Sequence, residues 1–283
     1  MRKVFLVCFC FLGIISAGLA ASPPKRVVSQ TVGTDDLLLA LADPGQIAAL
    51  SYLAHDPLHA PEAALAINYP KLSSSSAEDI LRFKPDIVLV TSFSPQECVA
   101  ILKQSGVRVF ILEKFETLDD VYTSILQLGD VLGQREKAEA LVAACRARVS
   151  SLNSALKGVR PVRVISAGVY PFISGSGTSF QDLCDNAGAI NVAAEKGIKG
   201  DVPTPVEKIL SWKIDYLIGF TDQRKNGLGP TLKESLKNVA PYRFLAAYKA
   251  GRIIEMPVAL FLATSHNRIA AFEMLAKALH PEL

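Results

Sequence analysis

One short sequence pattern occurs twice in this chain, once in each half. The first copy, residues 77–86, reads Ala-Glu-Asp-Ile-Leu-Arg-Phe-Lys-Pro-Asp, and the second, residues 206–215, reads Val-Glu-Lys-Ile-Leu-Ser-Trp-Lys-Ile-Asp. An apolar run follows each copy, as expected for a buried parallel strand, and an Arg-Val-x-Ser segment precedes each, at residues 26–29 and 163–166. A chain that repeats helix, turn and strand in this order predicts two similar lobes with a cleft between them.

The length of the chain suits two lobes. It has 283 residues, of which 50% are hydrophobic, enough for two domains of about 100–150 residues each. We place an N-terminal lobe at residues 25–133 and a C-terminal lobe at residues 158–283. The segment between them, residues 134–157, carries an apolar stripe at helical spacing and would form a helix about 35 Å long. This helix is the predicted connector of the two lobes.

Strands and helices alternate along both halves. Such alternation predicts an α/β fold, here two Rossmann-like lobes with mainly parallel sheets joined by one long connector helix. After the first strand we expect a helix from Asp36, with Thr34 or Asp35 as its N-cap. We expect the first strand at residues 26–32, a buried strand at 87–91 and a helix at 118–132, whose apolar residues fall on one face. We expect the stretch from Gly168 to Gly177 to be irregular.

The first twenty residues have the pattern of a secretory signal peptide. Arg2 and Lys3 precede an apolar run at residues 4–15, and small residues follow at 18–20; the run is too short to span a membrane. Removal of residues 1–20 would lower the formal net charge from +3 to +1. The sequence therefore predicts an exported, periplasmic protein without the basic surface that nucleic-acid binding needs.

The sequence carries no recognisable catalytic or redox motif. It contains no G-x-S-x-G elbow, and its four histidines follow no catalytic signature. The three cysteines beyond the leader lie in helical, apolar contexts typical of buried small hydrophobic residues. His55 and His59 could ligate a metal, but Pro57 disfavours the helix that would bring them together. We predict no catalytic residues, no metal site and no cofactor.

The motifs taken together resemble a known family. The order of Arg-Val-Val-Ser, Glu-x-Ile-Leu-x-x-Lys-Pro-Asp-Ile-Val, a long helix and a second such half is similar to periplasmic substrate-binding proteins of ABC importers. The similarity is to the two-lobed, helical-backbone family for cobalamin and ferric siderophores, and it covers Lys25 to Pro281. The resemblance implies a monomer that holds its ligand between two lobes and delivers it to a membrane permease. It also implies that Glu78 and Glu207, one on each lobe, pair with arginines of that permease.

In α/β lobes of this kind the cleft is lined by loops at the carboxyl ends of the strands. Aromatic side chains there would suit a large planar ligand, whereas an anionic siderophore usually requires several arginines. The predicted cleft residues are Thr34, Asp35, Tyr52, His55, Phe93, Tyr170, Phe172, Phe220, Arg224 and Phe261. Arg224 is the one arginine that we place near the cleft.

We therefore expect a non-catalytic binding protein for a metal-chelate nutrient, namely cobalamin, a ferric siderophore or haem. For haem, the candidate iron ligands are Tyr52, His55 and Tyr170. Two alternatives remain open: a zinc- or manganese-binding protein on the same scaffold, and a two-lobed glycosyltransferase-like enzyme, which would need nucleotide contacts.

Overall fold

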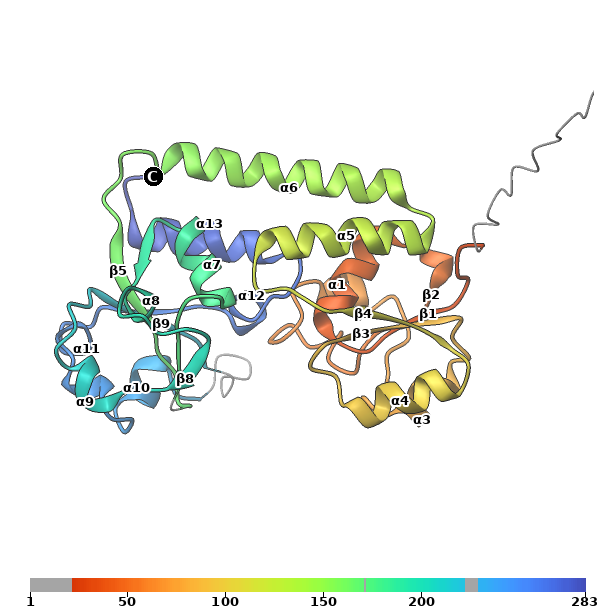
Figure 1. Cartoon of the computed structure of the whole chain (residues 1–283), viewed down its shortest axis with the longest axis horizontal. Helices are drawn as coiled ribbons and strands as arrows, with labels where there is room; N and C mark the ends of the chain where they lie inside the picture. Colours follow the sequence, from red (N-terminus) through yellow and green to blue (C-terminus); the bar gives the residue numbers. More distant parts are fainter. Residues whose placement is uncertain (1–21, 171, 222–228) are drawn as a thin grey trace, which may run out of the picture.

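The computed structural model describes residues 22–170, 172–221 and 229–283. It shows two α/β lobes side by side, with one long helix running along the same edge of both (Figure 1). The predicted two-lobed fold is confirmed. The predicted signal peptide lies outside the described residues, and within them no helix is long and apolar enough to cross a membrane.

The N-terminal lobe is built on a four-stranded parallel sheet in the order β2-β1-β3-β4. The central strand β3 is buried along its whole length, which explains its continuous apolar sequence. The strands are β1 (Val27–Ser29), β2 (Ile47–Ala49), β3 (Ile87–Thr91) and β4 (Arg108–Leu112). The helices are α1 (Val32–Leu41), η1 (Pro44–Gln46), α2 (Ala63–Ala66), α3 (Ala77–Arg82), α4 (Gln96–Gln104) and α5 (Leu118–Leu132).

The C-terminal lobe repeats this winding in a second parallel sheet, ordered β10-β9-β5-β7. In both sheets the first strand lies between the next two, and the last strand lies outside the third. The strands are β5 (Val162–Ser166), β7 (Ala189–Asn191), β9 (Tyr216–Gly219) and β10 (Ile253–Glu255). The helices are α7 (Ser179–Asn186), α8 (Val192–Glu195), α9 (Val206–Ile209), α10 (Leu232–Leu236), η2 (Tyr242–Phe244), α11 (Ala246–Lys249), α12 (Val258–Phe261) and α13 (Arg268–Leu279).

One small sheet departs from the sequence-based expectation. The stretch expected to be irregular contains β6 (Phe172–Ser174), which pairs antiparallel with β8 (Asp201–Pro203). Three residues give too short an alternation to read, and the partner strand lies far along the chain. The pairing is therefore determined by tertiary packing and not by local sequence.

The repeated Arg and Asp residues make the same contacts in both lobes. The backbone N–H of Asp86 donates to the carbonyl of Arg26 at 2.8 Å, and that of Asp215 donates to the carbonyl of Arg163 at 2.7 Å. Each Asp carboxylate in turn accepts from the backbone N–H of its Arg, at 2.9 and 3.1 Å. Each guanidinium Nε donates to the carbonyl of the Lys two residues before the Asp, at 3.1 and 2.8 Å. The repeat therefore fixes the pairing of the first and third strands of each sheet.

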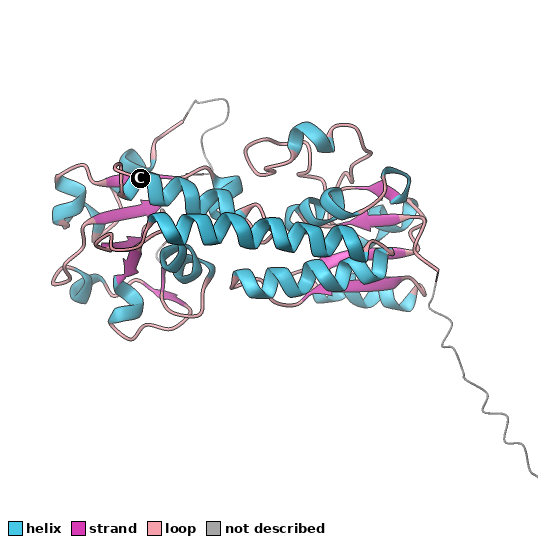
Figure 2. Ribbon diagram, turned by 90° about the horizontal axis from the view of Figure 1, so that it is seen from above, coloured by secondary structure: helices cyan, strands magenta, loops and turns pink. Residues whose placement is uncertain are grey.

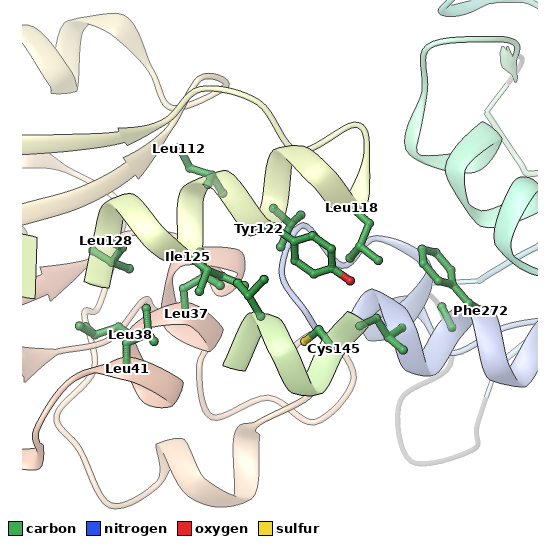
Figure 3. Packing of buried hydrophobic residues seen from close by; sticks show 14 of the residues in the cluster. Leu37, Leu38, Leu41, Leu112, Leu118, Tyr122, Ile125, Leu128, Cys145 and Phe272 are labelled. Carbon is green, nitrogen blue, oxygen red and sulfur yellow. The ribbon is translucent and has the colours of Figure 1, made fainter. Parts of the chain in front are cut away.

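The long helix α6 (Arg135–Ala155) crosses from one lobe to the other, as Figure 2 shows from above. It packs against α5 of the N-terminal lobe and against α7 and α13 of the C-terminal lobe. A single apolar cluster continues through these helices, with Ile125 on α5, Cys145 on α6 and Phe272 on α13 (Figure 3). The two lobes therefore share part of their core.

The three cysteines beyond the predicted leader are free and buried. Burial raises the pKa of Cys98, Cys145 and Cys184 above the usual thiol range, so all three remain protonated at neutral pH. They behave as the small hydrophobic residues that the sequence predicted.

Candidate ligand-binding cleft

A cavity of about 360 Å³ lies at the carboxyl ends of the N-terminal strands. The loops after three neighbouring strands form one wall, with residues 30–33 after β1, 51–53 after β2 and 93–95 after β3. The opposite wall is the segment 259–264, which leads from α12 of the C-terminal lobe towards α13. The cavity thus lies where the two lobes meet, as expected for a ligand site in parallel α/β sheets.

Gln30 provides a buried polar group in the cavity wall. Its side chain is 2% exposed, and Nε2 donates to the Ser75 carbonyl at 2.9 Å and to Cys98 Sγ at 3.2 Å. The Ser75 carbonyl only accepts, which fixes the orientation of the amide. Its oxygen, Oε1, is left without a hydrogen-bond partner in the described part of the chain. An unsatisfied buried acceptor of this kind is unfavourable until a donor reaches it.

Two adjacent buried acids lie behind and within this wall. Asp35 accepts from the backbone N–H and the hydroxyl of Ser51, and Asp36, which lines the cavity, accepts from the Ser265 hydroxyl at 2.6 Å. Burial raises the pKa of both carboxyl groups to about 7, although these hydroxyl groups partly oppose the increase. The Asp36–Ser265 hydrogen bond also ties α1 to the segment that precedes α13.

Gly33 permits this close approach. A Cβ atom on Gly33 would lie 1.9 Å from Thr264 Oγ1, far inside any allowed contact. The first turn of α1 can therefore pack directly against Thr264 only because this position lacks a side chain. The spacing between the two walls of the cavity depends on this contact.

Aromatic side chains line a second cavity, of about 120 Å³, on the C-terminal lobe. Phe220 and Phe261 pack against each other with ring centroids 5.2 Å apart. Tyr170 and Phe172 are 61% and 52% exposed, which is unusual for side chains of this size. Phe261 lies within the run 259–264, so the aromatic cavity adjoins the segment that closes the N-terminal one.

Six of the ten predicted cleft residues lie in these two walls. Tyr52 and Phe93 line the N-terminal cavity, and the aromatic residues just named line the C-terminal one. His55 lies outside both walls, with Nε2 3.1 Å from the Tyr69 carbonyl; its neighbour His59 lines the first cavity instead. Arg224 lies outside the described residues.

Thr34 and Asp35 lie behind the wall because α1 begins earlier than the sequence suggested. Thr31 is the N-cap, forming a capping box with Thr34, so both predicted cleft residues fall inside the helix and are 1% and 2% exposed. The expected N-cap at Thr34 or Asp35 is wrong. The same misplaced boundary concealed Gln30 and Asp36 as cleft residues. The first strand was expected to run to Val32, which leaves no loop after Ser29. A strand that ends at Ser29, as observed, places Gln30 in the loop at the cleft.

Glu78 and Glu207 are both exposed and lie in the first turns of α3 and α9. Figure 1 shows these two helices at the edge of each lobe opposite to α6. One carboxylate of the repeated pattern thus lies on each lobe, and both lie on the side of the molecule away from the connector.

The described residues contain no group of three or more His, Cys, Asp or Glu side chains placed to hold a metal ion.

Comparison with known proteins agrees with this architecture. Among curated relatives, the chain is 22% identical to an uncharacterized ABC transporter substrate-binding lipoprotein, YvrC, of Bacillus subtilis and 27% identical to the molybdate-binding protein MolA of Haemophilus influenzae. These alignments cover 73% and 75% of this chain, which spans only 66% and 65% of the length of those relatives.

Among solved structures, the periplasmic heme-binding protein RhuT from Roseiflexus sp. RS-1 matches with a TM-score of 0.77 and 22% identity, covering 91% of this chain and 98% of that one. At this identity the likeness establishes the fold. The relatives and neighbours named here are binding proteins and not enzymes, as the sequence predicted. Residues 27–260 match the family described as periplasmic binding protein, and the chain belongs to that family.

Proposed function

We propose that this protein is an exported solute-binding protein that captures a metal-chelate nutrient and delivers it to an ABC importer. The observation that carries the proposal is the pairing of two different cavity walls at the junction of the lobes. A cavity of about 360 Å³ on one lobe, largely apolar but with buried polar groups in its wall, adjoins an aromatic cavity on the other, and one segment contributes to both. A ligand with a planar apolar face and polar edges would contact both walls.

The aromatic wall favours a chelate over a bare ion. Exposed rings such as Tyr170 and Phe172 offer faces for stacking, whereas zinc or manganese would need a cage of ligating side chains. The described residues offer no such cage. The heme-binding neighbour supports a tetrapyrrole ligand, and the cobalamin and siderophore alternatives stay within the same class of metal chelates.

The paired glutamates support delivery to a permease. Two carboxylates, one on each lobe, can steer docking and set its register, and the helices that carry Glu78 and Glu207, α3 and α9, lie on one side of the molecule. With the predicted leader at residues 1–20, this supports a periplasmic protein that acts as a monomer and presents its ligand to a membrane partner.

The ligand class can be tested with purified protein and a panel of haem, cobalamin and ferric siderophores. We expect one of these chelates to bind with 1:1 stoichiometry and to raise the melting temperature, and we expect zinc and manganese salts to leave it unchanged. Stoichiometric binding of a bare ion, with no response to any chelate, would contradict the proposal and favour the metal-ion alternative.

Delivery can be separated from capture by charge reversal. The double variant Glu78→Arg, Glu207→Arg should lose uptake in cells by more than tenfold while the purified protein binds the chelate as tightly as the wild type, because neither residue lines either cavity. The matched control is Glu136→Arg, an exposed glutamate in the first turn of α6 on the opposite side. Wild-type uptake by the double variant would contradict a docking role for Glu78 and Glu207.

A further inference from the structure

The N-terminal cavity has a wall without positive charge. Among the described residues that line it there is no lysine or arginine. Its ionisable members are Asp36, Tyr52 and His59, and the imidazole of His59 lies 3.1 Å from the carboxylate of Asp56. The ammonium group of Lys71 donates to the Tyr52 carbonyl at 3.3 Å, at an exposed position at the rim. Apart from Lys71 at the rim, an anionic group entering this cavity would find no described lysine or arginine to pair with.

The same wall offers hydrogen-bond acceptors. Gln30 Oε1 is buried without a partner in the described structure, and its orientation is fixed because Nε2 is held by the Ser75 carbonyl. Asp36 adds a carboxyl group whose Oδ2 is bound to Ser265, while Oδ1 makes no hydrogen bond of normal geometry to a described residue. The Asn267 amide lies near enough to lower the pKa of Asp36 in part. Gln30 Oε1 has no such described neighbour and would be satisfied by a donor from a ligand.

We propose that this cavity selects the uncharged, hydrogen-bond-donating edge of the chelate, so that the ligand enters with amide or hydroxyl groups and not with carboxylates. This inference rests on the proposed function and specifies which edge of the chelate enters the N-terminal cavity. A buried acceptor gains its missing hydrogen bond from an N–H or O–H, whereas a carboxylate placed beside Asp36 would meet like charge in a poorly solvated site. An oxyanion or a polyanionic siderophore is disfavoured in this cavity for the same reason.

The experiment compares two ligands that differ in charge at one edge: cobalamin and its monocarboxylate, in which one peripheral amide is hydrolysed. The second pair is haem and its diamide, in which both propionates are converted to primary amides that can donate. Affinities are measured at pH 8, where Asp36 is ionised because burial raises its pKa only to about 7. We expect the uncharged member of whichever pair binds to bind about tenfold more tightly.

Two variants should move this preference in opposite directions. Thr31 lines the cavity and is the N-cap of α1; Thr31→Asp keeps a good N-cap and adds a negative charge, so the preference should widen several-fold. Asp36→Asn removes a negative charge and should bring the preference towards unity. A variant that merely loosens the fold would weaken both ligands alike and leave their ratio unchanged.

The control is Thr117→Asp, which adds the same charge at the N-cap of α5, outside both cleft cavities, and should not change the preference. Equal affinity for both members, or a preference for the anionic member, would overturn the inference while the proposed function stands. Binding of neither member of either pair, nor of a ferric siderophore, would overturn both.

Discussion

The two lobes share a frame but line the cleft with different side chains. Both sheets have the same winding, and both are tied by an Arg–Asp pair at the same place in the repeat. The N-terminal cavity sets two buried polar side chains, Gln30 and Asp36, in a largely apolar lining, whereas aromatic side chains dominate the C-terminal cavity. The residues that repeat in the sequence hold the strands together, and most of those that line the two cavities lie outside the repeat.

The largest effect should come from the part of the core that the lobes share. Phe272 is 1% exposed and packs in the cluster that runs through both lobes, so Phe272→Ala should lower the free energy of unfolding by about 3–5 kcal/mol. Trp212, the single tryptophan, lies in the C-terminal lobe and reports its unfolding by fluorescence, while circular dichroism reports the whole chain. We expect both signals to shift together in denaturant.

Leu102→Ala provides the comparison, because Leu102 is fully buried in a cluster confined to the N-terminal lobe. It should affect the circular dichroism transition at least as much as the tryptophan transition. If Phe272→Ala moved only the tryptophan signal, the lobes would not share a core.

A smaller effect on stability is expected at the contact between Gly33 and Thr264, which joins the two walls of the N-terminal cavity. In an unhindered helix, Gly→Ala stabilises by up to about 1 kcal/mol, but at Gly33 the new methyl group would overlap Thr264. We expect Gly33→Ala to destabilise by about 1–3 kcal/mol and to weaken ligand binding. Gly45→Ala is the control, since nothing lies within 4 Å of a Cβ there. Equal melting temperatures for the two variants would show that the Thr264 side chain moves aside without loss of stability.

The last expected effect is of similar size but depends on pH. Burial raises the pKa of Asp35 and Asp36 to about 7, so the folded state keeps these protons to a higher pH than the unfolded chain. Their contribution to stability is complete below about pH 4 and is lost as the pH rises through 7. Asp36→Asn should therefore gain on the order of 1–3 kcal/mol relative to wild type between pH 5 and pH 8. A difference that does not vary with pH, measured by denaturant unfolding, would contradict the raised pKa.

The sequence was most informative where local chemistry determines structure. Apolar periodicity predicted α5 at its observed bounds, Leu118–Leu132, and β3 at Ile87–Thr91. The start of α1 was misplaced because Thr31, Thr34 and Asp35 are all residue types that can cap a helix. Only the capping box between Thr31 and Thr34 in the folded chain selects Thr31. The contact between Gly33 and Thr264 joins distant parts of the chain, so no local pattern could have revealed it.

The central claim is that a chelate binds between the N-terminal cavity and the aromatic C-terminal cavity. The most direct measurement is the dissociation constant of the bound chelate for Phe93→Ala and Tyr170→Ala, one exposed aromatic from each wall. Phe244→Ala is the matched control, because Phe244 is 51% exposed but lines neither cavity. We predict that each cleft variant weakens binding by about tenfold and that the control does not. Unchanged affinity in both cleft variants would contradict the account.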